Sequence, residues 1–144
     1  MHVFKKISSD RDVFIPLLLE GDEDINMLGK YLHEGVLYGL YEDDQPVTLA
    51  LVLQHEGCTE LMNIVTREER RGMGYGSAML SFLSETYGDL RAGTGDVSPA
   101  RKFYEKNGFV ETGVRKDFFL QYDHPVIENG RQLVDMVIYE KRGV

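Results

Sequence analysis

The sequence predicts a mixed α/β fold with an antiparallel meander of strands at its centre. Apolar residues recur with a helical period in some segments and alternate in others, and turn-forming residues stand where the pattern changes. The chain has 144 residues, which is enough for one domain to bury its own hydrophobic core. We therefore expect residues 1–144 to form a single domain.

The first half of the chain is expected to begin with a strand and two helices and to continue with three strands. Residues 43–46 and the dipeptide Glu56-Gly57 are turn signals, so the three strands should pair as consecutive hairpins. The expected elements are, in chain order, a strand at residues 3–8, helices at 11–20 and 25–35, and strands at 36–42, 47–54 and 61–66.

The second half is expected to alternate between helices and strands. Tyr75, Met79 and Leu83 share one face of a helix, and Ser98 followed by Pro99 is typical of a helix start. The expected elements are helices at 74–86 and 99–107, and strands at 90–93, at 109–112 or somewhat further, and at 133–141.

The charge balance argues against a general nucleic-acid-binding protein. The chain carries 16 basic and 24 acidic residues, a net charge of −8, which would repel a phosphate backbone. The acidic stretches 22–24 and 42–44 are expected to be solvated loops. An alternative for the first stretch is that it attracts a cationic amine.

The N-terminal sequence and the cysteine content favour a cytoplasmic protein. The first ten residues contain no apolar leader, and no apolar run approaches the roughly 20 residues that a membrane span requires. Cys58 is the single cysteine, so an internal disulfide is impossible. We expect neither a membrane partner nor a nucleic-acid partner.

A glycine-rich loop at residues 66–77 has the composition of an anion-binding site. It follows an expected strand and begins an expected helix, whose first N–H groups lack intrahelical partners. Gly72, Gly74 and Gly76 would let the backbone approach a phosphate closely. Arg70 and Arg71 would add charge-assisted hydrogen bonds. The simpler alternative is an ordinary strand-to-helix turn.

Two common nucleotide-binding motifs do not fit this loop. A Walker A loop requires Lys followed by Ser or Thr after its last glycine, and neither is present. A dinucleotide fingerprint requires a third glycine where Ser77 or Met79 stands. The neighbouring strands are also expected to be antiparallel, which does not suit a βαβ unit.

These residues resemble the signature of the GNAT superfamily of N-acetyltransferases. Arg71-x-x-Gly74-x-Gly76 is similar to its (Gln/Arg)-x-x-Gly-x-(Gly/Ala) motif, and residues 98–109 resemble its second element, A-x-x-x-Y-E-K-x-G-F. The resemblance implies acetyl-CoA as co-substrate. It also implies a twisted, mostly antiparallel sheet of about six or seven strands with about four helices, splayed between the fourth and fifth strands. The segment from Asp117 to Met136 resembles a bacterial subgroup of mostly uncharacterised members.

The resemblance implies a set of cofactor-binding residues. Backbone groups of the fourth strand would bind the pantetheine arm, and the glycine loop would hold the pyrophosphate. Residues 93–96 would end the fifth strand at the acetyl group. Val97 replaces an asparagine that is frequent in the family, so Ser98 is expected to make that contact. The full set is Ile64, Val65, Thr66, Arg71, Gly72, Met73, Gly74, Tyr75, Gly76, Ser77 and Ser98.

The resemblance also implies two catalytic residues. Tyr104 matches the tyrosine that protonates the leaving thiolate, with a core aromatic as the alternative. Glu60 matches the general base of the histone-acetyltransferase branch, with an exposed strand carboxylate as the alternative. Residues 90–93 lack the carboxylate that other branches place on the fifth strand.

Other polar residues are weaker candidates for catalysis or binding. No histidine is paired with Cys58 in the sequence, so Cys58 is not expected to accept an acyl group. The histidines show no ligand spacing, and we expect no metal. Residues that could contact the acceptor or act as base are Asp117, Asp123, His124 and Asp135.

The sequence therefore predicts direct transfer of an acetyl group from acetyl-CoA to a primary amine. The acceptor would be a small molecule or a peptide, and a base must first remove the proton of its ammonium group. One alternative is a non-catalytic acyl-CoA sensor, which would dispense with Glu60 and Tyr104. Another is a nucleotide-binding regulatory domain. The family is often dimeric, so a homodimer is a further expectation.

Overall fold

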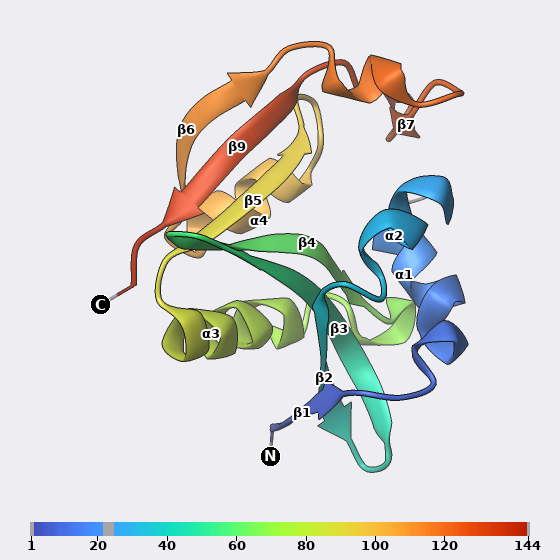
Figure 1. Ribbon diagram of the computed structural model, residues 1–144, viewed down its shortest axis with the longest axis vertical. Coiled ribbons are helices and arrows are strands. Elements are labelled where there is room, and N and C mark those ends of the chain that lie inside the picture. The colour runs from blue at the N-terminus through green and yellow to red at the C-terminus, as the bar shows by residue number, and fades with distance from the viewer. Residues whose placement is uncertain (1, 22–24, 144) are drawn as a thin grey trace.

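Seven strands form one twisted sheet, and helices pack on both of its faces (Figure 1). The computed structural model describes residues 2–21 and 25–143. The strand order is β1-β2-β3-β4-β5-β9-β6. The strands are β1 (Val3–Ile7), β2 (Val36–Glu42), β3 (Gln45–His55), β4 (Cys58–Thr66), β5 (Leu90–Gly95), β6 (Val110–Arg115) and β9 (Met136–Lys141).

Within residues 2–21 and 25–143, four α-helices flank the sheet: α1 (Ile15–Gly21), α2 (Ile25–Tyr31), α3 (Tyr75–Tyr87) and α4 (Ala100–Lys106). The same residues also form the short 3₁₀ helices η1 (Arg11–Phe14), η2 (Glu68–Arg70) and η3 (Phe118–Gln121). Among the described residues, no helix has the length and apolarity that a membrane span requires. The mixed α/β fold and the mostly antiparallel sheet predicted from the sequence are confirmed.

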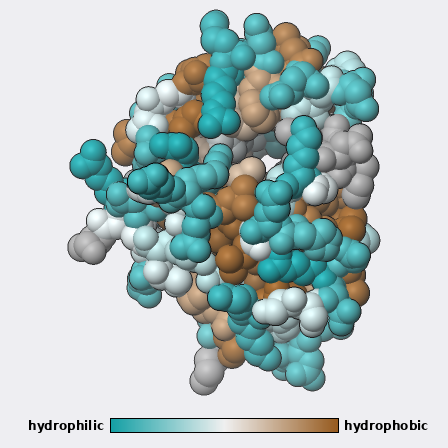
Figure 2. Space-filling model, viewed as in Figure 1, coloured by the Kyte–Doolittle hydropathy of each residue, from teal (hydrophilic) through white to brown (hydrophobic). Residues whose placement is uncertain are grey.

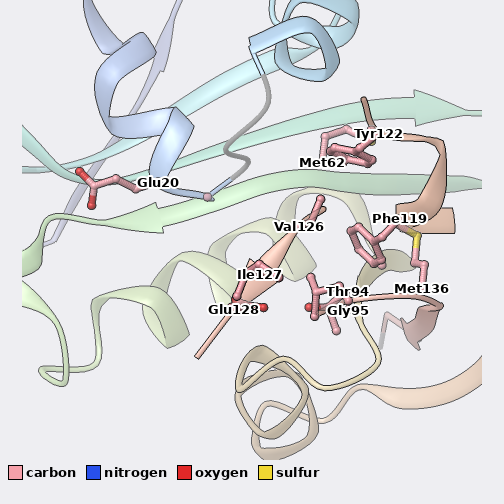
Figure 3. Close-up of a pocket in the computed structure, with 13 residues that line it drawn as sticks. Glu20, Met62, Thr94, Gly95, Phe119, Tyr122, Val126, Ile127, Glu128 and Met136 are labelled. Atoms are coloured by element: carbon pink, nitrogen blue, oxygen red, sulfur yellow. The ribbon is translucent and has the colours of Figure 1, made fainter. Parts of the chain in front are cut away.

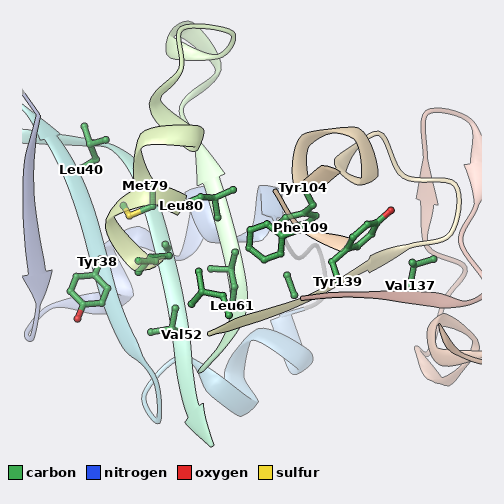
Figure 4. Packing of buried hydrophobic residues seen from close by; sticks show 14 of the residues in the cluster. Tyr38, Leu40, Val52, Leu61, Met79, Leu80, Tyr104, Phe109, Val137 and Tyr139 are labelled. Atoms are coloured by element: carbon green, nitrogen blue, oxygen red, sulfur yellow. The ribbon is translucent and has the colours of Figure 1, made fainter. Parts of the chain in front are cut away.

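Side chains of the central strands alternate between two hydrophobic clusters. Leu49 and Leu51 of β3 pack with α1 and α2, whereas Ala50 and Val52 pack with α3 on the other face. Because both faces are covered, β3 is an almost continuous apolar run. Figure 1 shows α1 and α2 across the sheet from α3, and Figure 4 shows part of the cluster on the α3 side.

The helix predicted at residues 11–20 is interrupted at its start. Pro16 has no N–H to bond the Asp12 carbonyl, which accepts instead from the N–H of Ile15. The first turn is therefore the 3₁₀ helix η1. The second helix was predicted to reach Gly35 but ends at Tyr31. The Arg11 guanidinium binds the carbonyls of Leu32 and Gly35 at 2.8 and 2.6 Å and satisfies them outside a helix.

The expectation of antiparallel neighbours around the glycine loop is wrong. β4 and β5 run parallel, with Thr59, Glu60 and Leu61 paired to Leu90, Arg91 and Ala92. The reason is that α3 carries the chain back to the end of the sheet at which β4 begins, so that β5 runs in the same direction as β4. The exclusion of a dinucleotide fold therefore rests on the glycine spacing alone.

A bulge in β4 begins the splay between β4 and β5. Leu51 of β3 pairs with Asn63 while Val52 pairs with Leu61, so Met62 is an extra residue. The bulge changes which face later side chains occupy. Leu61 and Ile64 both contact the α3 cluster, although they are three positions apart. Pairing with β5 stops at Leu61, while β4 continues to Thr66, as the family resemblance implied.

The C-terminal segment contains a small hairpin that was not predicted from the sequence. β7 (Ile127–Glu128) pairs with β8 (Arg131–Gln132). Asn129 and Gly130 have φ angles of 51° and 76°, as a type I′ turn requires. Leu133 packs with Phe119 and Val126 in a third cluster, so the strand predicted at 133–141 begins only at Met136.

Candidate active site

A cleft of about 530 Å³ opens where β4 and β5 separate. We call it the β4–β5 cleft; residues 61–66, the glycine loop, Gly93, Thr94 and the first turns of α4 line it. Figure 2 shows the surface hollowed between the β6–β9 side and the β1–β4 side, with hydrophobic side chains beneath the hollow. Since β5 has diverged here, β4 presents backbone groups without a partner strand. An extended amide-bearing arm can bond this edge.

The glycine loop is shaped to accept an anion at the start of α3. Gly74, the residue before the helix, has a φ of 88°, in the left-handed region that favours glycine. The first N–H that bonds within the helix is that of Ala78, which donates to the Gly74 carbonyl at 3.0 Å. The N–H groups of the preceding turn are therefore available to a phosphate.

Two arginines flank this loop, and each is held by a glutamate. Arg71 donates to Glu20 at 2.6 Å and to the Thr66 carbonyl at 2.9 Å. Arg70 lies 3.2 Å from Glu42, which also accepts the hydroxyl of Tyr75. That hydrogen bond raises the pKa of Tyr75. The cleft therefore combines glycine backbone with fixed positive charge, which fits the pyrophosphate of an acyl-CoA.

The structure brings nearly all the predicted cofactor-binding residues into one cleft. Met73 is the exception: it is 62% exposed and lies outside the lining. The Ser98 hydroxyl accepts the N–H of Ala100 at 3.1 Å, which stabilises the start of α4. The residues that line the cleft are Ile64, Val65, Thr66, Arg71, Gly72, Gly74, Tyr75, Gly76, Ser77 and Ser98.

Tyr104 lines the cleft and is also part of the core. Its ring lies 5.3 Å from that of Phe109 and 5.9 Å from that of Tyr139 (Figure 4). Burial raises the pKa of Tyr104, so its hydroxyl stays protonated at neutral pH. Among the described residues, this hydroxyl has no hydrogen-bond partner.

Glu60 and the weaker sequence candidates are not brought into the cleft. Glu60 lies on the paired part of β4, and its carboxylate is 2.8 Å from Nε2 of His55. Asp135 accepts the backbone N–H of Asp117 at 2.8 Å. Asp123 and His124 face each other at 2.7 Å. The part of the chain with described coordinates contains no group of three or more His, Cys, Asp or Glu that could hold a metal ion.

A second pocket of about 210 Å³ adjoins the cleft beside the β7–β8 hairpin (Figure 3). We call it the hairpin pocket. Figure 3 shows Glu128 and Thr94 at the end of this pocket away from Tyr122. Its lining consists of Glu20, Gly21, Met62, Gly93, Thr94, Gly95, Phe119, Tyr122, Val126, Ile127, Glu128, Leu133 and Met136.

The two glutamates of the hairpin pocket were not among the sequence candidates. Glu20 and Glu128 line both the cleft and the pocket. A local signal for the hairpin that carries Glu128 was present, because Asn-Gly between short apolar stretches is a strong indicator of a hairpin. No local signal could show that this hairpin faces the end of β5.

A family model and a curated relative both match this chain. Residues 33–111 match the model of the GNAT acetyltransferase domain. An uncharacterized N-acetyltransferase of Bacillus subtilis (strain 168), YvbK, is 31% identical over 134 residues, which cover 88% of this chain and 86% of the relative.

Solved structures agree over almost the whole chain. The IAA acetyltransferase of Bacillus cereus ATCC 14579 is 26% identical, with a TM-score of 0.87 and coverage of 99% of both chains. A GNAT acetyltransferase of Elizabethkingia anophelis with acetyl-CoA bound is 26% identical, with a TM-score of 0.89 and coverage of 98% of this chain and 97% of that one. A Bacillus subtilis acetyltransferase in complex with CoA is 26% identical, with a TM-score of 0.89 and full coverage of both.

The family resemblance and the acyl-CoA expectation are thereby confirmed. The chain belongs to the GNAT family of acetyltransferases, and its co-substrate is acetyl-CoA.

Proposed function

We propose that this protein transfers the acetyl group of acetyl-CoA directly to a primary amine. The observation that carries the proposal is the continuity of the β4–β5 cleft with the hairpin pocket. The two share six lining residues, among them Gly93 and Thr94 at the end of β5. A donor in the cleft and an amine in the pocket would meet there, without a covalent enzyme intermediate.

Each part of the cleft has a separate task in this proposal. The N–H groups at the start of α3 and the Arg71 guanidinium hold the pyrophosphate. The free edge of β4, from Ile64 to Thr66, holds the pantetheine amides. Acetyl-CoA supplies an activated thioester. Tyr104 donates its hydroxyl proton to the thiolate as the amide forms.

Glu60 remains our predicted base, acting through water because its carboxylate lies outside both pockets. An alkylammonium has a pKa near that of lysine, about 10.4, so its proton must leave before attack. Glu60→Gln should therefore lower kcat/KM for the amine more at neutral pH than at alkaline pH. An equal loss of kcat/KM at neutral and at alkaline pH would show that Glu60 is not the base.

Calorimetry with acetyl-CoA and a thiol-release assay over an amine panel together test the proposed function. We expect saturable binding of acetyl-CoA and acetyl-dependent thiol release that requires an amine. Binding without release for any amine would favour the non-catalytic sensor instead. Absence of acetyl-CoA binding would remove the proposal altogether.

A further inference from the structure

We propose that Glu128 receives the amino group of the acceptor and that the hairpin pocket selects a small primary amine with an apolar, preferably aromatic, body. This inference rests on the proposed amine acetyltransferase activity. It assigns a substrate class and a specificity residue to the same site.

Glu128 stands where the donor and the acceptor must meet. It lines both the β4–β5 cleft and the hairpin pocket, together with Gly93 and Thr94. The family-implied position of the acetyl group is this end of β5. An amine within reach of the Glu128 carboxylate would therefore lie next to the thioester.

The charge of Glu128 has no partner among the described residues. The other carboxylate of the pocket, Glu20, is bound to Arg71 at 2.6 Å. Arg131 pairs with Glu128 in the register of the hairpin, but no ion pair joins the two side chains. Glu128 is half-buried. A partly desolvated carboxylate without a counter-charge favours a cationic ligand, and no Lys, Arg or His is among the described pocket residues.

The hairpin pocket is small, and apolar side chains form one part of its lining. Phe119, Val126 and Leu133 are buried in a cluster of their own, and Tyr122 and Met136 pack against it. The volume of about 210 Å³ is below the roughly 300–1,000 Å³ of sites for drug-sized ligands. A compact apolar or aromatic body fits this lining, whereas a large polar polycation such as an aminoglycoside does not.

The hairpin fixes the position of Glu128. The Asn129-Gly130 turn closes one end of the hairpin. At the other end, the N–H of Leu133 donates to the Val126 carbonyl at 2.8 Å. The carboxylate is thus held on a short two-stranded element anchored by the Phe119 cluster, which favours recognition with defined geometry.

The direct test is calorimetric titration of phenethylamine into the CoA-saturated protein. We expect Glu128→Gln, which keeps shape but removes charge, to weaken phenethylamine binding roughly tenfold or more. The affinity for CoA should not change. Glu85→Gln, an exposed glutamate on α3, is the matched control and should bind like the wild type. Glu128→Asp should recover part of the affinity.

Two further ligands test the charge and the body separately. Phenylethanol lacks the ammonium group and should bind weakly and equally to wild type and Glu128→Gln. Putrescine lacks the apolar body and should bind the wild type more weakly than phenethylamine. If Glu128→Gln fails to fold, Ile127→Lys places a cation on an exposed pocket position and should weaken phenethylamine binding without changing the affinity for CoA.

Equal affinity of wild type and Glu128→Gln for phenethylamine, or tighter binding of putrescine, would overturn the inference. No binding of phenethylamine would do the same. Thiol release with other amines that is insensitive to Glu128→Gln would leave the transferase intact and remove only this assignment. Binding of phenethylamine that depends on Glu128, without thiol release, would support the assignment of Glu128 and contradict the proposed transferase activity.

Discussion

Tyr104 shows at the residue scale how one side chain serves both the core and the site. Its ring packs against Phe109 and Tyr139, so substitution by a small residue would open a cavity. Tyr104 also lines the β4–β5 cleft, and its hydroxyl has no hydrogen-bond partner in the described chain. The two alternatives that the sequence left open, core aromatic and general acid, are therefore compatible.

Tyr104→Phe separates the two roles. The ring remains, so we expect the free energy of unfolding to change by less than about 1 kcal/mol. Loss of the proton donor should lower kcat roughly 100-fold or more, with acetyl-CoA affinity retained. Tyr87→Phe, outside both pockets, is the control. Steady-state kinetics and calorimetry measure both effects, and an unchanged kcat would show that another group protonates the thiolate.

The sequence predicted the residues of the β4–β5 cleft better than those of the hairpin pocket, for a physical reason. The glycine loop and the Tyr104 helix are each local segments whose chemistry is readable from neighbouring residues. Glu20 and Glu128 belong to different elements, more than a hundred positions apart, and share a pocket only because the sheet brings them together. Glu60, which remains a predicted base, lies where β4 and β5 are still paired.

At the scale of elements, the loop before α3 requires glycine at position 74 for its backbone conformation, and not because a larger side chain would lack room. No atom lies within 4 Å of a Cβ built at Gly74, so its φ of 88° is the constraint. Gly76 differs, because a Cβ there would meet the Phe103 ring at 3.1 Å and force the ring away from α3.

Gly74→Ala should therefore strain the loop by about 1–2 kcal/mol and weaken acetyl-CoA binding. Gly29→Ala in α2 is a matched control, because Gly29 has helical backbone and open space around it. There alanine should stabilise the protein by about 0.5–1 kcal/mol. Denaturant unfolding and calorimetry distinguish the two. Equal effects of the two substitutions would contradict the conformational explanation.

Helix and strand boundaries were less predictable than the elements themselves. Pro16 lies inside the predicted 11–20 helix, and its missing N–H explains the 3₁₀ start. The bulge at Met62 leaves no local sequence signal, because an extra residue in a strand is defined only by its partner strand.

At the scale of the whole molecule, several tyrosines are held in environments that disfavour ionisation. Burial raises the pKa of Tyr87, Tyr104 and Tyr139, and the hydroxyls of Tyr38 and Tyr87 lie 2.6 Å apart. A hydrogen bond to Glu42 raises the pKa of Tyr75. These side chains lie in different parts of the fold, so their effect on stability is collective.

Stability should therefore fall at alkaline pH. The folded pKa values lie above the unfolded value of about 10, so the contribution is intact below that pH. As pH rises further, the unfolded chain releases protons that the folded protein retains, and the free energy of unfolding decreases. Denaturant midpoints measured from neutral to strongly alkaline pH would show this, and Tyr104→Phe should reduce the slope. The same slope in that variant would show that Tyr104 does not contribute to the effect.

The sequence by itself determined the family, the donor and the order of the main helices and of the strands of the large sheet, because these depend on local patterns of turns, glycines and apolar residues. Only the tertiary structure decided the direction of β5, the bulge that opens β4, and the meeting of Glu20 with Glu128 beside Thr94. These features arise from pairing and packing between distant segments, which no single stretch of sequence contains.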